Sequence, residues 1–169
     1  SYLLIGGSSD IAQILAKELI ESGHLVTLLA RDVERISHLE ELGADIIEGD
    51  ALDESIVSAA VEHAKGRSEE GLAGAAHSVG SIVVRPPHAT NLEDFEAVIQ
   101  PNLVSAFIML KLVGKSMLRN GAGRMVFTSS VAGSYGLTNH EAISAAKGGL
   151  EAMVRSAAST YAQRGIRVN

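Results

Sequence analysis

The chain has 169 residues, of which 46% are hydrophobic, and it carries a net charge of −6 at pH 7. Its length and apolar content fit one folded domain over residues 1–169 and argue against disorder. The acidic balance provides no basic surface for nucleic acid, and the absence of cysteine excludes disulfides and cysteine-ligated metals.

Two further features concern metals and membranes. The six histidines include no pair at metal-ligand spacing on one helical face, so no metal site is predicted. The apolar runs are short and interrupted, and the chain opens on strand-like residues without a charged and then apolar leader. We therefore expect a soluble, cytoplasmic protein without a membrane partner.

Strand-like runs alternate with helical patterns along the whole chain. Such repeated β-then-α units predict an α/β fold, a doubly wound parallel sheet with helices on both faces in three layers. The run Leu25–Leu29 is nearly all apolar, as expected of a strand covered on both faces. The expected strands are Tyr2–Ile5, Leu25–Leu29, Ala44–Ile47, Leu72–Ala76, Met125–Thr128 and Ile166–Val168, and the expected helices lie near residues 10–22, 33–42, 53–64, 92–119 and 140–163.

The turn after the first strand is rich in small residues. Gly6, Ser8 and Ser9 would let the backbone approach the diphosphate of a dinucleotide. The free amides at the start of the following helix would attract the negative charge of that diphosphate. Asp10 could cap that helix, but its carboxylate would repel a diphosphate. An ordinary strand-to-helix turn is the alternative interpretation.

The ends of the second and third strands carry charged residues. Arg31 follows the second strand, where dinucleotide folds contact the adenosine ribose, and a guanidinium there favours the 2′-phosphate of NADP(H) over NAD(H). The alternative is a solvated Arg31 that begins a helix capped by Asp32. Asp50 and Ala51 follow the third strand, where they could contact the cofactor. The sequence does not distinguish this role for Asp50 from that of a helix cap for the segment starting at Asp53.

The middle of the chain contains one helix with an internal proline. Pro101 cannot donate a helical hydrogen bond, so the helix near residues 92–119 should kink at this point, next to Asn102. A kinked helix with a purely structural role is the plain alternative. Before this helix, the fourth strand leads into His77, Ser78 and Gly80, for which the residue types alone predict no chemical role.

The stretch from Met125 to Leu150 carries the most specific pattern. A strand ends in the hydroxyls of Thr128, Ser129 and Ser130, a glycine-broken loop follows, and an Ala- and Gly-rich helix carries Lys147. This layout resembles the active-site segment of the short-chain dehydrogenase/reductase family, in which a Tyr follows the Ser by 13 residues and a Lys follows the Tyr by four. Lys147 matches, but the tyrosine position holds Ile143.

The resemblance implies a Rossmann-type fold and a role for each matching residue. Ser130 would polarise a carbonyl with Ser129 as a substitute, Lys147 would bind the nicotinamide ribose, and Asn102 would hold a water that relays protons to Lys147. Around the cofactor, Gly6 matches the first glycine of Gly-x-x-x-Gly-x-Gly, whose other two positions hold Asp10 and Ala12. The remaining cofactor-binding residues implied are Ser8, Ser9, Ile11, Arg31, Asp50, Ala51 and Gly80.

The departure at Ile143 removes the usual proton donor, because an aliphatic side chain cannot ionise, donate or accept. Loss of a general acid costs roughly 10²- to 10⁴-fold in rate. His140 lies three residues earlier and nearly on the same face if the helix already includes it, and its ordinary pKa is near neutrality. Tyr135 in the loop is the other candidate donor, and both residues are alternatively plain loop or capping residues.

We therefore predict an NADP(H)-dependent oxidoreductase that acts on a small carbonyl or alcohol substrate with an altered proton donor. A catalytically silent protein that binds NADP(H) or serves as an oligomeric subunit is the alternative. The resemblance also implies a homodimer or homotetramer formed through the helices near 92–119 and 140–163. Members of the family continue with a Pro-Gly loop, a substrate-covering segment and a last strand, so the resemblance implies that the domain in residues 1–169 is C-terminally incomplete.

Overall fold

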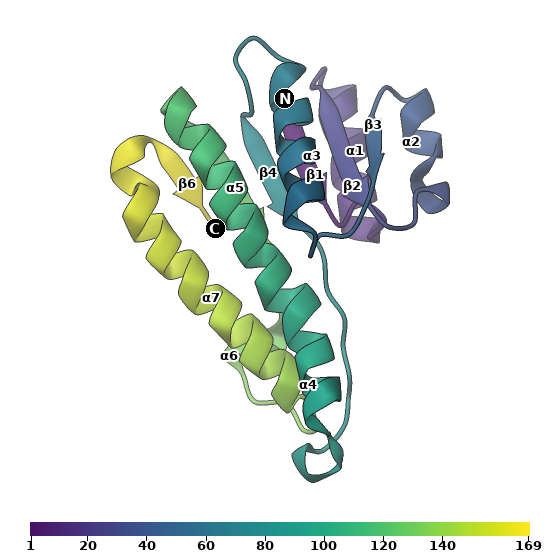
Figure 1. Ribbon diagram of the computed structural model, residues 1–169, viewed down its shortest axis with the longest axis vertical. Helices are drawn as coiled ribbons and strands as arrows, with labels where there is room; N and C mark the ends of the chain where they lie inside the picture. Colours follow the sequence, from purple (N-terminus) through teal and green to yellow (C-terminus); the bar gives the residue numbers. More distant parts are fainter.

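Six short apolar segments form one parallel sheet in the computed structural model, which describes residues 1–169 (Figure 1). Every pair of neighbouring strands is parallel, and the strand order is β3-β2-β1-β4-β5-β6. The strands are β1 (Tyr2–Ile5), β2 (Val26–Ala30), β3 (Asp45–Glu48), β4 (Gly74–His77), β5 (Gly123–Phe127) and β6 (Ile166–Val168).

The strand order changes direction at β1. From β1 the chain builds outward through β2 to β3, and it then returns to place β4 on the other side of β1. In open parallel sheets, the carboxyl ends of the strands at such a reversal form a crevice in which ligands bind. The turns that follow β1 and β4 therefore face each other across this crevice.

Helices cover both faces of the sheet, as the sequence predicts. Neighbouring residues of a strand point to opposite faces, so Leu3 joins the larger core with α3, α5 and α7, and Leu4 joins the smaller core with α1 and α2. The helices are α1 (Asp10–Glu21), α2 (His38–Glu41), α3 (Glu54–Gly66), α4 (Leu92–Ile99), α5 (Ser105–Asn120), α6 (Val131–Ser134) and α7 (Glu141–Tyr161).

Two of the expected helices are divided. The segment 33–42 forms a 3₁₀ turn at Glu34–Ile36 and then the short α2, because the Ser37 hydroxyl donates to the Glu34 carbonyl and competes with the helical pattern. The helix near 92–119 contains a π-helical segment, Gln100–Val104, between α4 and α5. Pro101 lies in that segment, so the predicted break is present and takes the form of a widened turn.

The run Leu92–Asn120 corrects one expectation. It is helical over 29 residues, and its most apolar window has a mean hydropathy of 1.5, which is long and apolar enough to cross a membrane. The expectation that the apolar runs are short and interrupted was therefore wrong for this segment. Half of that window is buried within the fold, and Met109 and Val113 belong to the larger core, so the run is a core helix.

Candidate functional site

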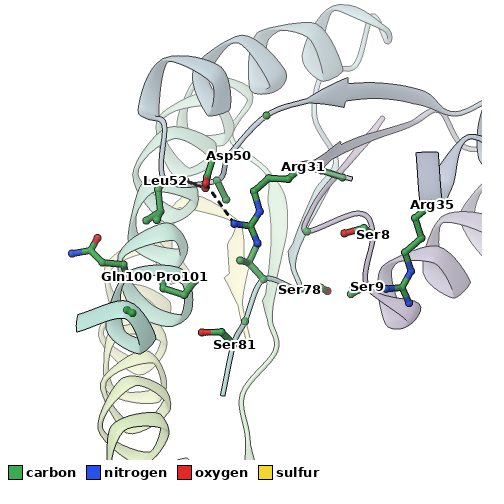
Figure 2. Close-up of a pocket in the computed structure, with 17 residues that line it drawn as sticks. Ser8, Ser9, Arg31, Arg35, Asp50, Leu52, Ser78, Ser81, Gln100 and Pro101 are labelled. Carbon is green, nitrogen blue, oxygen red and sulfur yellow. Dashed lines mark hydrogen bonds and ion pairs between the residues drawn. The ribbon is translucent and has the colours of Figure 1, made fainter. Parts of the chain in front are cut away.

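A cavity of about 540 Å³ lies at the carboxyl ends of the central strands (Figure 2). Of the nine residues that the sequence assigns to the cofactor, seven line it, while Lys147 adjoins it and Ile11 does not. Ile11 lies in the first turn of α1 with 59% of its surface exposed. The seven are Gly6, Ser8, Ser9, Arg31, Asp50, Ala51 and Gly80.

The glycine at the first turn is required by both backbone shape and space. Gly6 has a φ of +86°, and a Cβ atom there would lie 2.7 Å from the backbone carbon of Ser78. The turns after β1 and β4 can therefore meet only because position 6 has no side chain. Nearby, Ser9 is the N-cap of α1, and its Oγ accepts a hydrogen bond of 3.2 Å from the Ala12 amide.

Arg31 and Asp50 both line the cavity and form an ion pair on one side of it (Figure 2). Arg31 Nη1 lies 3.8 Å from Asp50 Oδ2, and Asp50 Oδ1 accepts from the Leu52 amide at 2.9 Å. The capping alternative for Asp50 is not met, because Asp53 is the N-cap of α3. Asp32 accepts a hydrogen bond of 3.2 Å from the Arg35 amide, as the alternative interpretation of Arg31 expected. Arg31 nevertheless lines the cavity, so the capped turn does not exclude a role in binding.

Arg35 also lines the cavity, and sequence reasoning missed it. Its Nη2 donates to Asp10 Oδ1 at 2.7 Å, beside the turn that carries Ser9 (Figure 2). The sequence did contain a signal for Arg35, because it follows Arg31 by four residues and could therefore lie near the same part of the cavity. The Arg35–Asp10 ion pair also places a cation against Asp10, whose carboxylate is expected to repel a diphosphate.

These features fit a dinucleotide. A glycine cradle and the N-terminus of α1 suit a diphosphate, and the Arg31 guanidinium suits a phosphate at the ribose end. The described residues contain no group of three or more His, Asp or Glu side chains that could hold a metal ion.

Ser130 and Lys147 come together at the end of β5. Ser130 is the N-cap of α6, and its Oγ accepts from the Ala132 amide at 3.2 Å, which leaves its hydrogen free to donate. Lys147 is only 5% exposed, and its Nζ donates to the Thr128 carbonyl at 2.7 Å. Burial lowers the pKa of the Lys147 amine below its ordinary value.

Asn102 connects this pair to the cavity. Its Nδ2 donates to the carbonyl oxygens of Ser81 at 2.8 Å and Val98 at 2.9 Å, while its buried Oδ1 has no partner. A Cβ atom at Gly80 would lie 3.0 Å from Asn102 Oδ1 and 3.9 Å from Lys147 Nζ. The predicted residues Asn102, Gly80 and Lys147 therefore meet at one edge of the cavity.

Ile143 is 3% exposed and packs in an apolar cluster with Val98, Ala132 and Ala146. It is one turn before Lys147 on α7 but is not among the residues that line the cavity. The aliphatic residue thus fills space between α4, α6 and α7.

Both candidate proton donors lie where the loop and capping alternatives put them. The helix α7 begins at Glu141 and His140 precedes it as the N-cap residue, so the condition that the helix includes His140 is not met. Its Nδ1 lies 2.6 Å from the Thr138 carbonyl, so the ring is held in the loop. Tyr135 lies in the same loop with 72% of its surface exposed.

Two polar networks near the site were not predicted from the sequence. Glu151 accepts hydrogen bonds from Ser129 Oγ at 2.7 Å and from Ser134 Oγ at 2.9 Å. The bond from Ser129, and to a smaller extent the bond from Ser134, lowers the pKa of the Glu151 carboxyl. Because the Ser129 hydroxyl is bound to Glu151, Ser130 remains the hydroxyl available to a substrate.

The second network contains His77, which is fully buried. Ser105 Oγ donates to the Pro101 carbonyl at 2.6 Å and lies 2.8 Å from His77 Nε2, so the imidazole donates from Nε2. Burial, and secondly the charge of Lys147, lower the pKa of His77 to about 3. The neutral ring links β4 to the π-helical segment that carries Asn102.

Acid should destabilise the fold through His77. The folded protein keeps this ring neutral well below pH 6.5, whereas the unfolded chain binds a proton there, so the free energy of unfolding should fall by about 1.4 kcal/mol per pH unit below pH 6.5. Denaturant unfolding from pH 7 to pH 4 measures this slope. His77→Asn should flatten it, and an exposed histidine variant, His88→Asn, should keep it. An unchanged slope in His77→Asn would contradict the assignment.

A parallel sheet with reversed strand order, a glycine turn and a polar cavity at the strand ends defines a dinucleotide-binding α/β protein. Residues 2–169 match the sequence profile described as short chain dehydrogenase. The chain therefore belongs to the short-chain dehydrogenase/reductase family, whose members bind nicotinamide cofactors, and the predicted family and Rossmann-type fold are confirmed.

Individual relatives agree with this assignment. The 3-oxoacyl-(acyl-carrier-protein) reductase MabA of Mycobacterium bovis is 32% identical over 169 residues, all of this chain. The inactive 2-(S)-hydroxypropyl-CoM dehydrogenase 2 of Xanthobacter autotrophicus is 30% identical over 160 residues, which are 92% of this chain and 68% of that protein. The NAD⁺-bound xylitol dehydrogenase superposes with a TM-score of 0.92 at 28% identity, covering 99% of this chain and 67% of that one. The chain spans 66% of the length of MabA, just under two thirds.

Proposed function

We propose that this protein is an NADP(H)-dependent oxidoreductase that acts on a small carbonyl or alcohol and uses an altered proton donor. One observation carries the proposal. The buried amine of Lys147 binds the strand end that presents Ser130, and it adjoins Gly80 at the edge of the cavity. A hydroxyl that can polarise a carbonyl therefore follows the strand end that Lys147 binds, and Lys147 lies at the edge of the cavity.

In this proposal the nicotinamide supplies the hydride when it is bound. Gly6 and the amides at the start of α1 hold the diphosphate, and Asp50 and Ala51 lie at the adenosine end. The Ser130 hydroxyl donates to the carbonyl oxygen of the substrate, which stabilises the negative charge that develops there.

The proton for that oxygen must come from a group other than residue 143. We assign proton delivery to Lys147, since burial lowers the pKa of its amine and so makes the ammonium a stronger acid nearer neutral pH. Asn102 supports this assignment, because its buried and unpartnered Oδ1 is an acceptor at the same edge of the cavity, where a water could pass protons to Lys147.

NADP(H) is favoured over NAD(H) because Arg31 lies at the ribose end of the cavity, where it pairs with Asp50. Arg31→Ala should weaken NADPH binding by about 10- to 100-fold, the value of a charge-assisted phosphate contact. NADH affinity should stay within about twofold. Titration by nicotinamide fluorescence measures both constants. Arg124→Ala, which removes an exposed arginine on β5, is the control, and an equal loss for both cofactors in Arg31→Ala would refute the assignment.

A catalytically silent cofactor-binding protein is the second candidate, and one observation favours it. Ile143 is buried among apolar residues of α4, α6 and α7, so this part of the site is packed without any ionisable group. One relative at 30% identity is itself described as inactive. The two candidates differ in whether the unsubstituted protein oxidises NADPH when small ketones are added, and turnover that requires Lys147 supports the first.

Residues 1–169 would act as a single cytoplasmic dinucleotide-binding unit that assembles into a homodimer or homotetramer through α4, α5 and α7. In support, Leu92, Phe107 and Leu118 are exposed along the first two helices, and Ala145 and Ala152 leave α7 open to close approach. Light scattering on the purified protein gives the mass that tests this assembly.

A further inference from the structure

The start of α1 combines two features that oppose each other. Asp10 is the first residue of this 12-residue helix, whose N-terminus attracts anions and lies against the cavity through Ser8 and Ser9. Its own carboxylate already carries a negative charge there. A cofactor diphosphate would therefore meet a like charge at the position where the family pattern has a glycine.

Arg35 removes this conflict. Its guanidinium binds the Asp10 carboxylate at 2.7 Å and reaches it from the turn that follows β2, 25 residues away in sequence. Arg35 lines the cavity together with Ser8 and Ser9 (Figure 2). Its charge therefore lies beside the diphosphate end, whereas Arg31 pairs with Asp50 on another side of the cavity.

We propose that Arg35 is a charge-compensating residue that neutralises Asp10 and so permits the α1 N-terminus to accept a diphosphate. The inference rests on the proposed function, because it requires a nicotinamide dinucleotide in this cavity. It assigns the two arginines different tasks. Arg31 distinguishes NADPH from NADH, and Arg35 serves the diphosphate that both cofactors share.

The charges around the cavity explain why the effect should be measurable although the side chains of the pair are exposed, Arg35 by 55% and Asp10 by 82%. Asp10 and Asp50 are balanced by Arg35 and Arg31. Removing Arg35 alone leaves an uncompensated carboxylate at a helix end that must receive an anion, and water screens that repulsion only in part. Removing Asp10 at the same time restores the balance.

The experiment measures NADPH and NADH affinity by fluorescence titration for the unsubstituted protein and four variants. Arg35→Ala should weaken both cofactors alike, by about three- to tenfold, and the loss should shrink as salt rises. The double variant Arg35→Ala with Asp10→Gly should return to within about twofold of the unsubstituted protein. Arg35→Lys, which keeps the charge, should bind nearly as well as the unsubstituted protein. Lys17→Ala, which removes an exposed cation from the same helix, should change neither constant.

The outcomes separate this inference from the proposed function. An unsubstituted protein that binds neither cofactor overturns the proposed function and the inference with it. A protein that binds both, with Arg35→Ala unchanged, overturns only the compensation by Arg35. A loss confined to NADPH, or one that Asp10→Gly does not rescue, also overturns it, because Arg35 would then act on the cofactor directly.

Discussion

Replacing Ile143 with tyrosine is expected to raise NADPH-dependent reduction of small ketones by about 10²- to 10⁴-fold, the usual contribution of a positioned general acid. Position 143 lies one turn before Lys147 on the same face of α7, so a phenol there has the lysine as its neighbour. The nearby ammonium would favour the ionised phenol and lower its pKa, which is the property that proton transfer requires. Initial rates at saturating NADPH measure the gain.

The matched control is Ile143→Phe, which adds the ring without the hydroxyl. It should show no gain, and any shared loss of stability from crowding the apolar cluster around Val98 and Ala132 should appear in both variants. In the unsubstituted protein, Lys147→Met should remove residual turnover if Lys147 delivers the proton. A parent already as fast as the tyrosine variant would contradict the expected gain and would mean that another residue donates the proton, whereas an inert parent beside an active variant supports the silent alternative.

Gly6→Ala should destabilise the protein by about 2–5 kcal/mol. A left-handed backbone costs about 1–2 kcal/mol for an L-residue, and overpacking a tight contact costs about 1–3 kcal/mol more. Here the added Cβ would lie 2.7 Å from the backbone of Ser78 and Val79, which cannot move without disturbing the end of β4. Because this contact joins the two sides of the cavity, cofactor binding should weaken as well.

Gly23→Ala is the control for backbone shape alone. Gly23 follows α1 with a φ of +82°, and nothing lies within 4 Å of the position that a Cβ would take. This variant should lose only about 1–2 kcal/mol and should bind cofactor normally. Denaturant unfolding compares the two. If Gly6→Ala is no less stable than Gly23→Ala, the close approach of the two turns does not constrain this position.

Local patterns predicted most of the fold and much of the candidate site. The strand and helix periods depend on neighbouring residues, and the spacing of Ser130, Ile143 and Lys147 is a property of a single strand, loop and helix. Helix boundaries were less predictable. The helix expected near 140–163 begins at Glu141, so His140 lies just outside it, because the end of a helix depends on local backbone contacts that the periodic pattern does not encode.

The amino-acid sequence by itself determined the α/β class, the family pattern, the glycine at position 6 and the absence of a phenol before Lys147. Those properties are local, since each depends on residue type and short spacing. Only the tertiary structure decided that Arg35 reaches Asp10, that the buried His77 contacts Ser105, and that Asn102 and Gly80 meet Lys147. These contacts join residues at least 22 positions apart, and the packing of the strands and helices decides which distant side chains meet.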